Sequence, residues 1–108
     1  VQIQGDSDIT IDGRHKIYIN KTNTAGNNYD IQVGTGANVN IQVDKGDVNL
    51  VTVDGKINMN SGGDFNVKVG GNYNMTVAGN RQIDVEGTTT DNTTGNVIHR
   101  GARIDLNP

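Results

Sequence analysis

The chain contains no cysteine, no tryptophan and a single proline, so several common means of stabilising a small protein are missing. Without cysteine it can form neither a disulfide framework nor a thiolate metal site. Aromatic residues make up only 4% and apolar residues only 32% of the 108 residues, whereas typical globular chains are nearly half apolar. One chain therefore has little material for a hydrophobic core of its own.

Long apolar runs and clusters of basic residues are also absent. No segment approaches the roughly 20 apolar residues that span a bilayer, and no signal-peptide pattern is present. Nine basic residues stand against twelve acidic ones, giving a net charge of -3, which argues against nucleic acid as a partner. Because the chain starts at Val1 in the middle of a repeat, we expect it to be part of a longer polypeptide.

The apolar residues that are present alternate with polar ones. Between residues 1 and 97, 27 apolar residues stand at odd positions and only four at even positions, which are Tyr18, Val48, Leu50 and Ala78. A period of two predicts β-strands with one apolar face and excludes helix. The same strict register argues against disorder despite the low hydrophobicity. The even positions, rich in Asn, Asp, Lys and Thr, form a solvated face.

Glycine recurs every eight residues within the pattern V-x-G-x-h-x-h-x, in which h is apolar. We expect each octad to be one strand and one corner, with the glycine inward where φ can be positive and neighbouring backbone is close. The expected corner glycines are Gly5, Gly13, Gly55, Gly63, Gly71, Gly79, Gly87 and Gly95.

Three stretches depart from the octad pattern. Residues 22–28 have the character of a two-residue insertion in one corner, which preserves the two faces because it is even. In residues 45–52 the parity is inverted, which indicates a bulge or a locally reversed face. From residue 98 onward the apolar residues stand at even positions. We therefore predict an octad-repeat shaft over residues 1–97 and a differently built tip over residues 98–108.

Octads of this kind can stack in two ways. A single chain coiling on itself would make about 4.5 turns and be about 22 Å long, whereas three chains winding together would make a shaft of about 60 Å. Closing the sheets between chains leaves no lateral strand edge exposed. We therefore predict an all-β fold, an intertwined trimeric, triple-stranded β-helix, which is a β-prism solenoid.

The run V-D-G, S-G-G, V-G-G, V-A-G, V-E-G at octad spacing resembles the valine-glycine repeat needle of contractile-tail phage central spikes and type VI secretion spikes. The resemblance covers about Ile3 to Gly87. Its departures are Lys21 at an expected corner glycine, Ser61 at a valine position and the irregular unit from Lys45.

The resemblance implies a homotrimeric needle in the tail baseplate of a virion, or alternatively a secreted type VI spike. Such a needle continues from the N-terminal remainder of the spike and the tail hub, and it is driven transiently through the target outer membrane. A conical cap protein docks on its C-terminal tip. In phage spikes the oligosaccharide-binding barrel and the muramidase domain precede the needle, so we expect no enzymatic activity from this segment.

The candidate site residues follow from parity and from this resemblance. The expected cap-docking tip consists of Ile98, Ala102, Ile104 and Leu106. Three copies of His15 near a trimer axis could hold a metal ion or an anion, but we favour a hydrated or stacked polar layer. Some spike tips of this class bind iron through H-x-H, whereas His99 is a lone histidine. We therefore expect no metal and no cofactor.

An irregular polar unit offers one further candidate for an interior ion. Lys45, Asp47 and Asn49 stand at nominally inward positions and could enclose an ion with water. A bulge that turns them outward is the interpretation we favour.

The alternative function is that of a tailspike-like β-helix that binds or cleaves carbohydrate. Such a protein uses aromatic platforms and a pair of carboxylates. This chain has four aromatic residues, and nine of its twelve carboxylates stand at even, outward positions. The octads also differ from calcium-binding repeats, which have a period of nine. We favour the needle.

Overall fold

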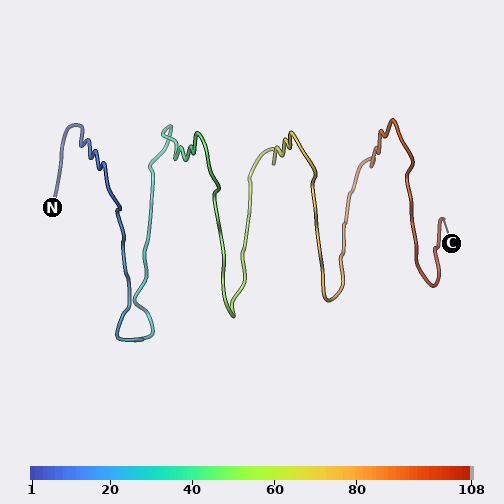
Figure 1. The fold of residues 1–108 in the computed structure, drawn as a ribbon, viewed down its shortest axis with the longest axis horizontal. Helices are drawn as coiled ribbons and strands as arrows, with labels where there is room; N and C mark the ends of the chain where they lie inside the picture. The colour runs from blue at the N-terminus through green and yellow to red at the C-terminus, as the bar shows by residue number, and fades with distance from the viewer. Residues whose placement is uncertain (108) are drawn as a thin grey trace. The chain divides into compact units, whose positions relative to one another are not determined.

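The computed structural model describes residues 1–107 and divides the chain into two units, Val1–Ile57 and Asn58–Pro108. Pro108, which belongs to the predicted tip, lies outside the described residues. Residues 1–107 contain no helix and no hydrogen-bonded strand; extended segments alternate with bends and turns (Figure 1). In this part of the chain no helix has the length and apolarity needed to cross a membrane.

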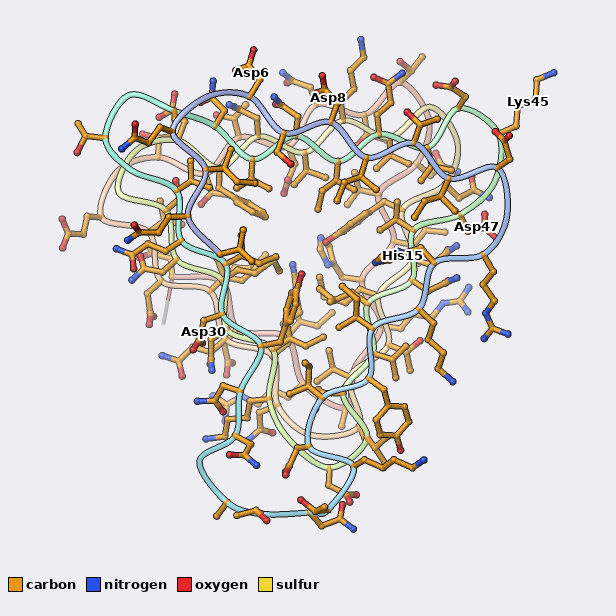
Figure 2. All side chains as sticks on the ribbon, turned by 90° about the vertical axis from the view of Figure 1, so that its left-hand side faces the viewer. Asp6, Asp8, His15, Asp30, Lys45 and Asp47 are labelled. Carbon is orange, nitrogen blue, oxygen red and sulfur yellow. The ribbon has the colours of Figure 1, made fainter. Side chains whose placement is uncertain are left out.

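The first unit runs as extended segments between bends around a three-sided path, coloured blue to green in Figure 2. Asp6, Asp8 and Asp30 point away from this path, whereas His15 points to its inner side. The three aspartates stand at even positions and His15 at an odd one, as expected for extended backbone with a period of two. The bends and turns fall at residues 4–5, 12–13, 21–22, 25–26, 35–36, 44–46 and 53–55.

Residues 20–27 form the protruding loop of the first unit, and Asn20 organises it. The Asn20 side-chain oxygen accepts hydrogen bonds from the Thr24 amide at 2.8 Å and from the Asn27 carboxamide at 3.2 Å. The Asn20 carbonyl accepts a further bond from the Asn23 amide at 3.0 Å. Asn20 and Asn23 have φ of 60° and 57°, and Gly26 has φ of 90°. Asparagine and glycine tolerate this left-handed region because a short polar side chain or a missing Cβ lowers its cost.

Two further turns of the first unit also use left-handed glycine. Gly36 has φ of 80° and Gly46 has φ of 137°. The Ala37 amide closes the turn at Gly36 by donating to the Gly34 carbonyl at 3.3 Å. The bends at residues 25–26, 35–36, 44–46 and 53–55 are nine or ten residues apart rather than eight, so these turns accommodate residues that exceed a regular octad.

The second unit is more regular. Its bends fall at residues 62–63, 70–71, 78–79, 86–87 and 94–95, at intervals of eight, followed by residues 102 and 106. Each of the first five includes an octad glycine, and none of these glycines has a positive φ. The Ser61 hydroxyl donates to the Asp64 carbonyl at 2.9 Å across the first of these bends. Extended segments of equal length therefore alternate with bends that need no special backbone conformation.

Neither unit has a core of its own. No described residue is buried, and the solvent-accessible surface of the chain is 12455 Å². A folded monomer of this mass exposes about 5,800 Å². Within the described chain, no two Cα atoms twelve or more residues apart lie within 8 Å of each other. The extended segments thus lack strand partners within the chain, and the β-helix stays a prediction.

Candidate functional site

The inner side of the bends in the second unit is hollowed and lined by odd-position residues. One hollow of about 480 Å³ is lined by Tyr73, Met75, Val77, Gly79 and Arg81. A second, of about 320 Å³, is lined by Met59, Ser61, Gly63 and Phe65. Each hollow spans one bend and the segments beside it. The odd residues of consecutive segments therefore share a concave surface, which is the part of the chain most suited to receive a partner.

The even positions make the contacts expected of an outer polar face. Gln42 donates to Asp44 at 2.8 Å and Gln82 donates to Asp84 at 2.7 Å, in both cases between side chains two residues apart. The Lys16 ammonium lies 5.5 Å from the centre of the Tyr18 ring. Side chains at i and i+2 meet in this way because extended backbone places them on the same face. These short-range contacts are exposed and leave the odd face free.

The octad glycines of the second unit are spatially unconstrained within one chain. A Cβ built on Gly63, Gly71, Gly79, Gly87 or Gly95 would meet no atom within 4 Å. We expected a crowded corner with a positive φ at these positions. The described chain has neither feature there, because left-handed glycines occur only at Gly26, Gly36 and Gly46. Any requirement for glycine at these five positions must therefore come from atoms outside the chain.

Gly55 is an intermediate case. A Cβ on Gly55 would lie 3.0 Å from the Thr52 hydroxyl oxygen, and that oxygen accepts a hydrogen bond from the Gly55 amide at 3.2 Å. At this bend the glycine permits a close side-chain contact with the backbone, although its φ is not left-handed.

The tip residues lie on an exposed surface opposite an ion pair. Ile98, Ala102, Ile104 and Leu106 are all exposed, with Leu106 at 86%. At the intervening odd positions the Arg103 guanidinium donates to the Asp105 carboxylate at 2.7 Å. Apart from Arg100, the tip therefore carries apolar residues at even positions and charges at odd ones, the reverse of the preceding octads. Its last residue, Pro108, lies outside the described residues.

The candidate ion ligands do not gather within one chain. Among residues 1–107 no group of three or more His, Asp or Glu side chains is placed to hold a metal ion. His15 points to the inner side of the path, but Lys45 points away from it (Figure 2). Lys45 therefore does not face the interior. His99 lies in the exposed segment before the bend at residue 102.

One residue of the concave surface escaped our parity argument. Arg81 stands at octad position five, where the three preceding octads have Ile57, Phe65 and Tyr73. A charged residue at an apolar repeat position is the signal that could have identified it. Arg81 lines the same hollow as Tyr73 and Met75.

Comparison with protein-family models, with curated proteins and with solved structures finds no match to this chain.

Proposed function

We propose that three copies of this chain intertwine into a rigid β-helical shaft that acts as the membrane-piercing needle of a contractile-tail spike. The observation that carries the proposal is that the extended segments of each unit pair with no other part of the described chain. The eight-residue interval between bends in the second unit suits strands that pair between chains, and the octad resemblance indicates the function of such a shaft.

Distances within the chain favour three intertwined chains over one chain that coils on itself. A self-paired coil would bring residues one circuit apart, about 24 positions, to one strand spacing of about 4.8 Å. The described chain keeps all Cα atoms twelve or more residues apart beyond 8 Å. In an intertwined trimer the strands of two other chains lie between successive circuits, so the same residues are about 14 Å apart. Of these two spacings, only the second is compatible with a separation beyond 8 Å.

Unsatisfied backbone groups support the same arrangement. A folded domain has about one internal hydrogen bond per residue, whereas the described backbone pairs only in the turns at Asn20–Asn23 and Gly34–Ala37. Every extended segment thus presents donors and acceptors on both edges. Two neighbouring chains would satisfy both edges and cover the odd face with its valines and isoleucines. The stability of such a shaft belongs to the assembly.

The proposed mechanism is mechanical. A closed triangular prism of paired strands has no exposed lateral edge and resists bending, so it can transmit a thrust along its axis. The polar even face allows it to pass through water, and the C-terminal tip leads. Ile98, Ile104 and Leu106 form the apolar end layer of the shaft, and a conical cap protein covers that layer. The shaft itself performs no chemical step, and the lytic activity of a spike resides in other domains.

Mass and shape in solution test this proposal. We expect light scattering to give a particle of three times 11.5 kDa, and small-angle X-ray scattering to give a rod of about 60 Å. A fibre diffraction or circular dichroism signature of β-structure should accompany assembly. A compact monomer about 22 Å along its axis would overturn the intertwined shaft, and specific binding or hydrolysis of a glycan would favour the tailspike alternative.

A further inference from the structure

Arg81 is the one charged residue that lines either hollow of the second unit. It shares its hollow with Tyr73, Met75 and Val77. It stands at the fifth position of its octad, which is Tyr73 in the preceding octad and Thr89 in the following one. Within residues 1–107 the recorded ion pair is Arg103 with Asp105, so Arg81 is not neutralised inside its own chain. The interior of the shaft thus includes a guanidinium that needs a counter-charge.

We propose that the three Arg81 side chains of the trimer bind one inorganic oxyanion, of the phosphate or sulfate type, on the shaft axis. This inference rests on the trimeric shaft proposed above, because the site is incomplete with one chain. Threefold symmetry brings three copies of Arg81 to the same height. Three unpaired guanidinium groups in an interior lined by Tyr73, Met75 and Val77 would be prohibitively costly. A multivalent anion offsets that cost.

The chemistry of the neighbouring repeat positions fits an oxyanion. In stacked octads, strands from neighbouring chains place equivalent positions side by side, so Arg81 lies between Tyr73 and Thr89 of other chains. Both residues have hydroxyl groups that donate hydrogen bonds. Guanidinium groups bind tetrahedral oxyanions through paired N–H donors. The site therefore combines three cationic forks with a ring of hydroxyl donors.

The competing counter-charge is Asp91, the nearest carboxylate at an odd position in the second unit. It lies ten residues beyond Arg81, past the bend at residues 86–87. Its octad position is seven, whereas that of Arg81 is five, so the register sets Thr89 beside Arg81 and displaces Asp91 along the strand by two residues. Because extended backbone advances about 3.3 Å per residue, that displacement is about 6.6 Å. A diagonal pair of this kind is within reach of a long side chain, so Asp91 is the counter-charge that the test must distinguish from an oxyanion.

The test is the anion content of the intact trimer. Trimer whose mass has been confirmed by light scattering is dialysed into acetate buffer and then denatured, and the released phosphate and sulfate are measured by ion chromatography. We expect one oxyanion per three chains in the wild type and in the control Lys68→Gln, whose residue stands at an even position. In Arg81→Gln we expect none.

A second measurement tests the proposal even if the Arg81→Gln variant does not assemble. Wild-type trimer refolded without oxyanion should melt at a lower temperature than trimer refolded with sulfate, because a ligand that binds only the folded state stabilises it. A different result would overturn the anion site: a trimer that contains no oxyanion and that Asp91→Asn and Arg81→Gln destabilise equally. That result would show that Asp91 neutralises the arginines, and the shaft proposal would be unaffected. A monomeric chain would overturn both.

Discussion

The two units of the chain differ in the backbone conformation of their bends. In residues 1–57 the turns at 20–26, 36 and 46 use left-handed asparagine or glycine. In residues 58–97 five bends follow one another every eight residues without a left-handed residue. The difference shows that the regular octad corner is locally unstrained. Apart from Asn107 near the tip, the left-handed residues occur where bends are more than eight residues apart and additional residues must be accommodated.

The comparison also separates two roles of glycine. Gly36 permits a backbone conformation that other residues adopt at a cost, whereas Gly71 has an ordinary φ and open space around it within one chain. If Gly71 is required, the requirement comes from the neighbouring chains of the assembly. Substitutions can therefore distinguish a property of the chain from a property of the trimer.

The largest effect is expected from a charge on the concave face of the second unit. Phe65→Asp places a carboxylate in the hollow lined by Met59, Ser61 and Gly63, which has no charged lining residue and which the trimer would bury in three copies. Burying an uncompensated charge costs several kcal/mol per site, so we expect assembly to be lost. Light scattering checks the mass. The matched control is Asn66→Asp on the even face, which should remain trimeric, and a trimeric Phe65→Asp variant would show that the odd face is not the interior.

Removal of the tip should abolish cap binding but leave trimer assembly unchanged. We expect deletion of residues 99–108 to eliminate binding of the cognate cap, because it removes Ile104 and Leu106 from the exposed end layer. The octads of residues 58–97 should still assemble. Co-elution of cap with intact and truncated needle measures the effect, and full binding by the truncated trimer would place the docking surface elsewhere.

Paired glycine substitutions should produce intermediate effects with different causes. Gly36→Val forces a β-branched residue into φ of 80°, at a cost of about 1–3 kcal/mol, and Gly36→Asn should recover most of it because asparagine tolerates this region. Gly71→Val should cost about 1–3 kcal/mol per chain through overpacking against neighbouring chains. Gly71→Asn should not restore stability, because it also adds a Cβ.

Thermal melting of the four variants measures these effects. The outward substitution Asn72→Ala serves as the control for Gly71 and should change little. If asparagine rescues both glycine positions equally, the two corners do not differ in the way proposed. A harmless Gly71→Val would mean that no neighbouring chain approaches this corner.

The smallest effect is expected at the protruding loop of the first unit. Asn20→Ala removes the oxygen that accepts hydrogen bonds from Thr24 and Asn27 and leaves a less tolerant residue at φ of 60°. We expect a loss of about 1 kcal/mol, because each of these two exposed hydrogen bonds contributes at the lower end of the usual range of about 0.5–1.5 kcal/mol. Amide exchange at Thr24 should accelerate while exchange in residues 58–97 stays unchanged. Asn38→Ala, a substitution on the exposed even face, is the control.

Some features of the structure could be predicted from local patterns in the sequence, and others could not. The extended character of the chain and the places where it bends are foreshadowed by the alternation of apolar residues and the recurrence of glycine, because both are properties of a few consecutive residues. The explanation given for the glycines did not carry over to the octad bends, whose φ values are ordinary. Lys45 stands at a nominally inward position but points away from the interior (Figure 2), which is the orientation favoured for this irregular unit.

Other features required positions in space. The hydrogen bonds of Asn20 span up to seven residues, and no repeat pattern predicts which asparagine of the loop will accept them. The place of Arg81 beside Tyr73 and Met75 depends on how two segments fold around the bend at residues 78–79. The octad pattern has an apolar residue at that position, and the hollow places Arg81 on the same concave surface as the apolar residues.

The sequence by itself determined the two faces of the chain and the eight-residue interval between bends, since strand alternation and glycine spacing act over one or two turns of the repeat. Only the tertiary structure decided which turns use left-handed residues, where Arg81 and His15 lie, and that segments one circuit apart stay beyond pairing distance. The physical reason is the difference in the range, along the chain, over which these properties are set. Periodicity specifies what each residue prefers locally, whereas the distance between circuits depends on the sum of many backbone angles.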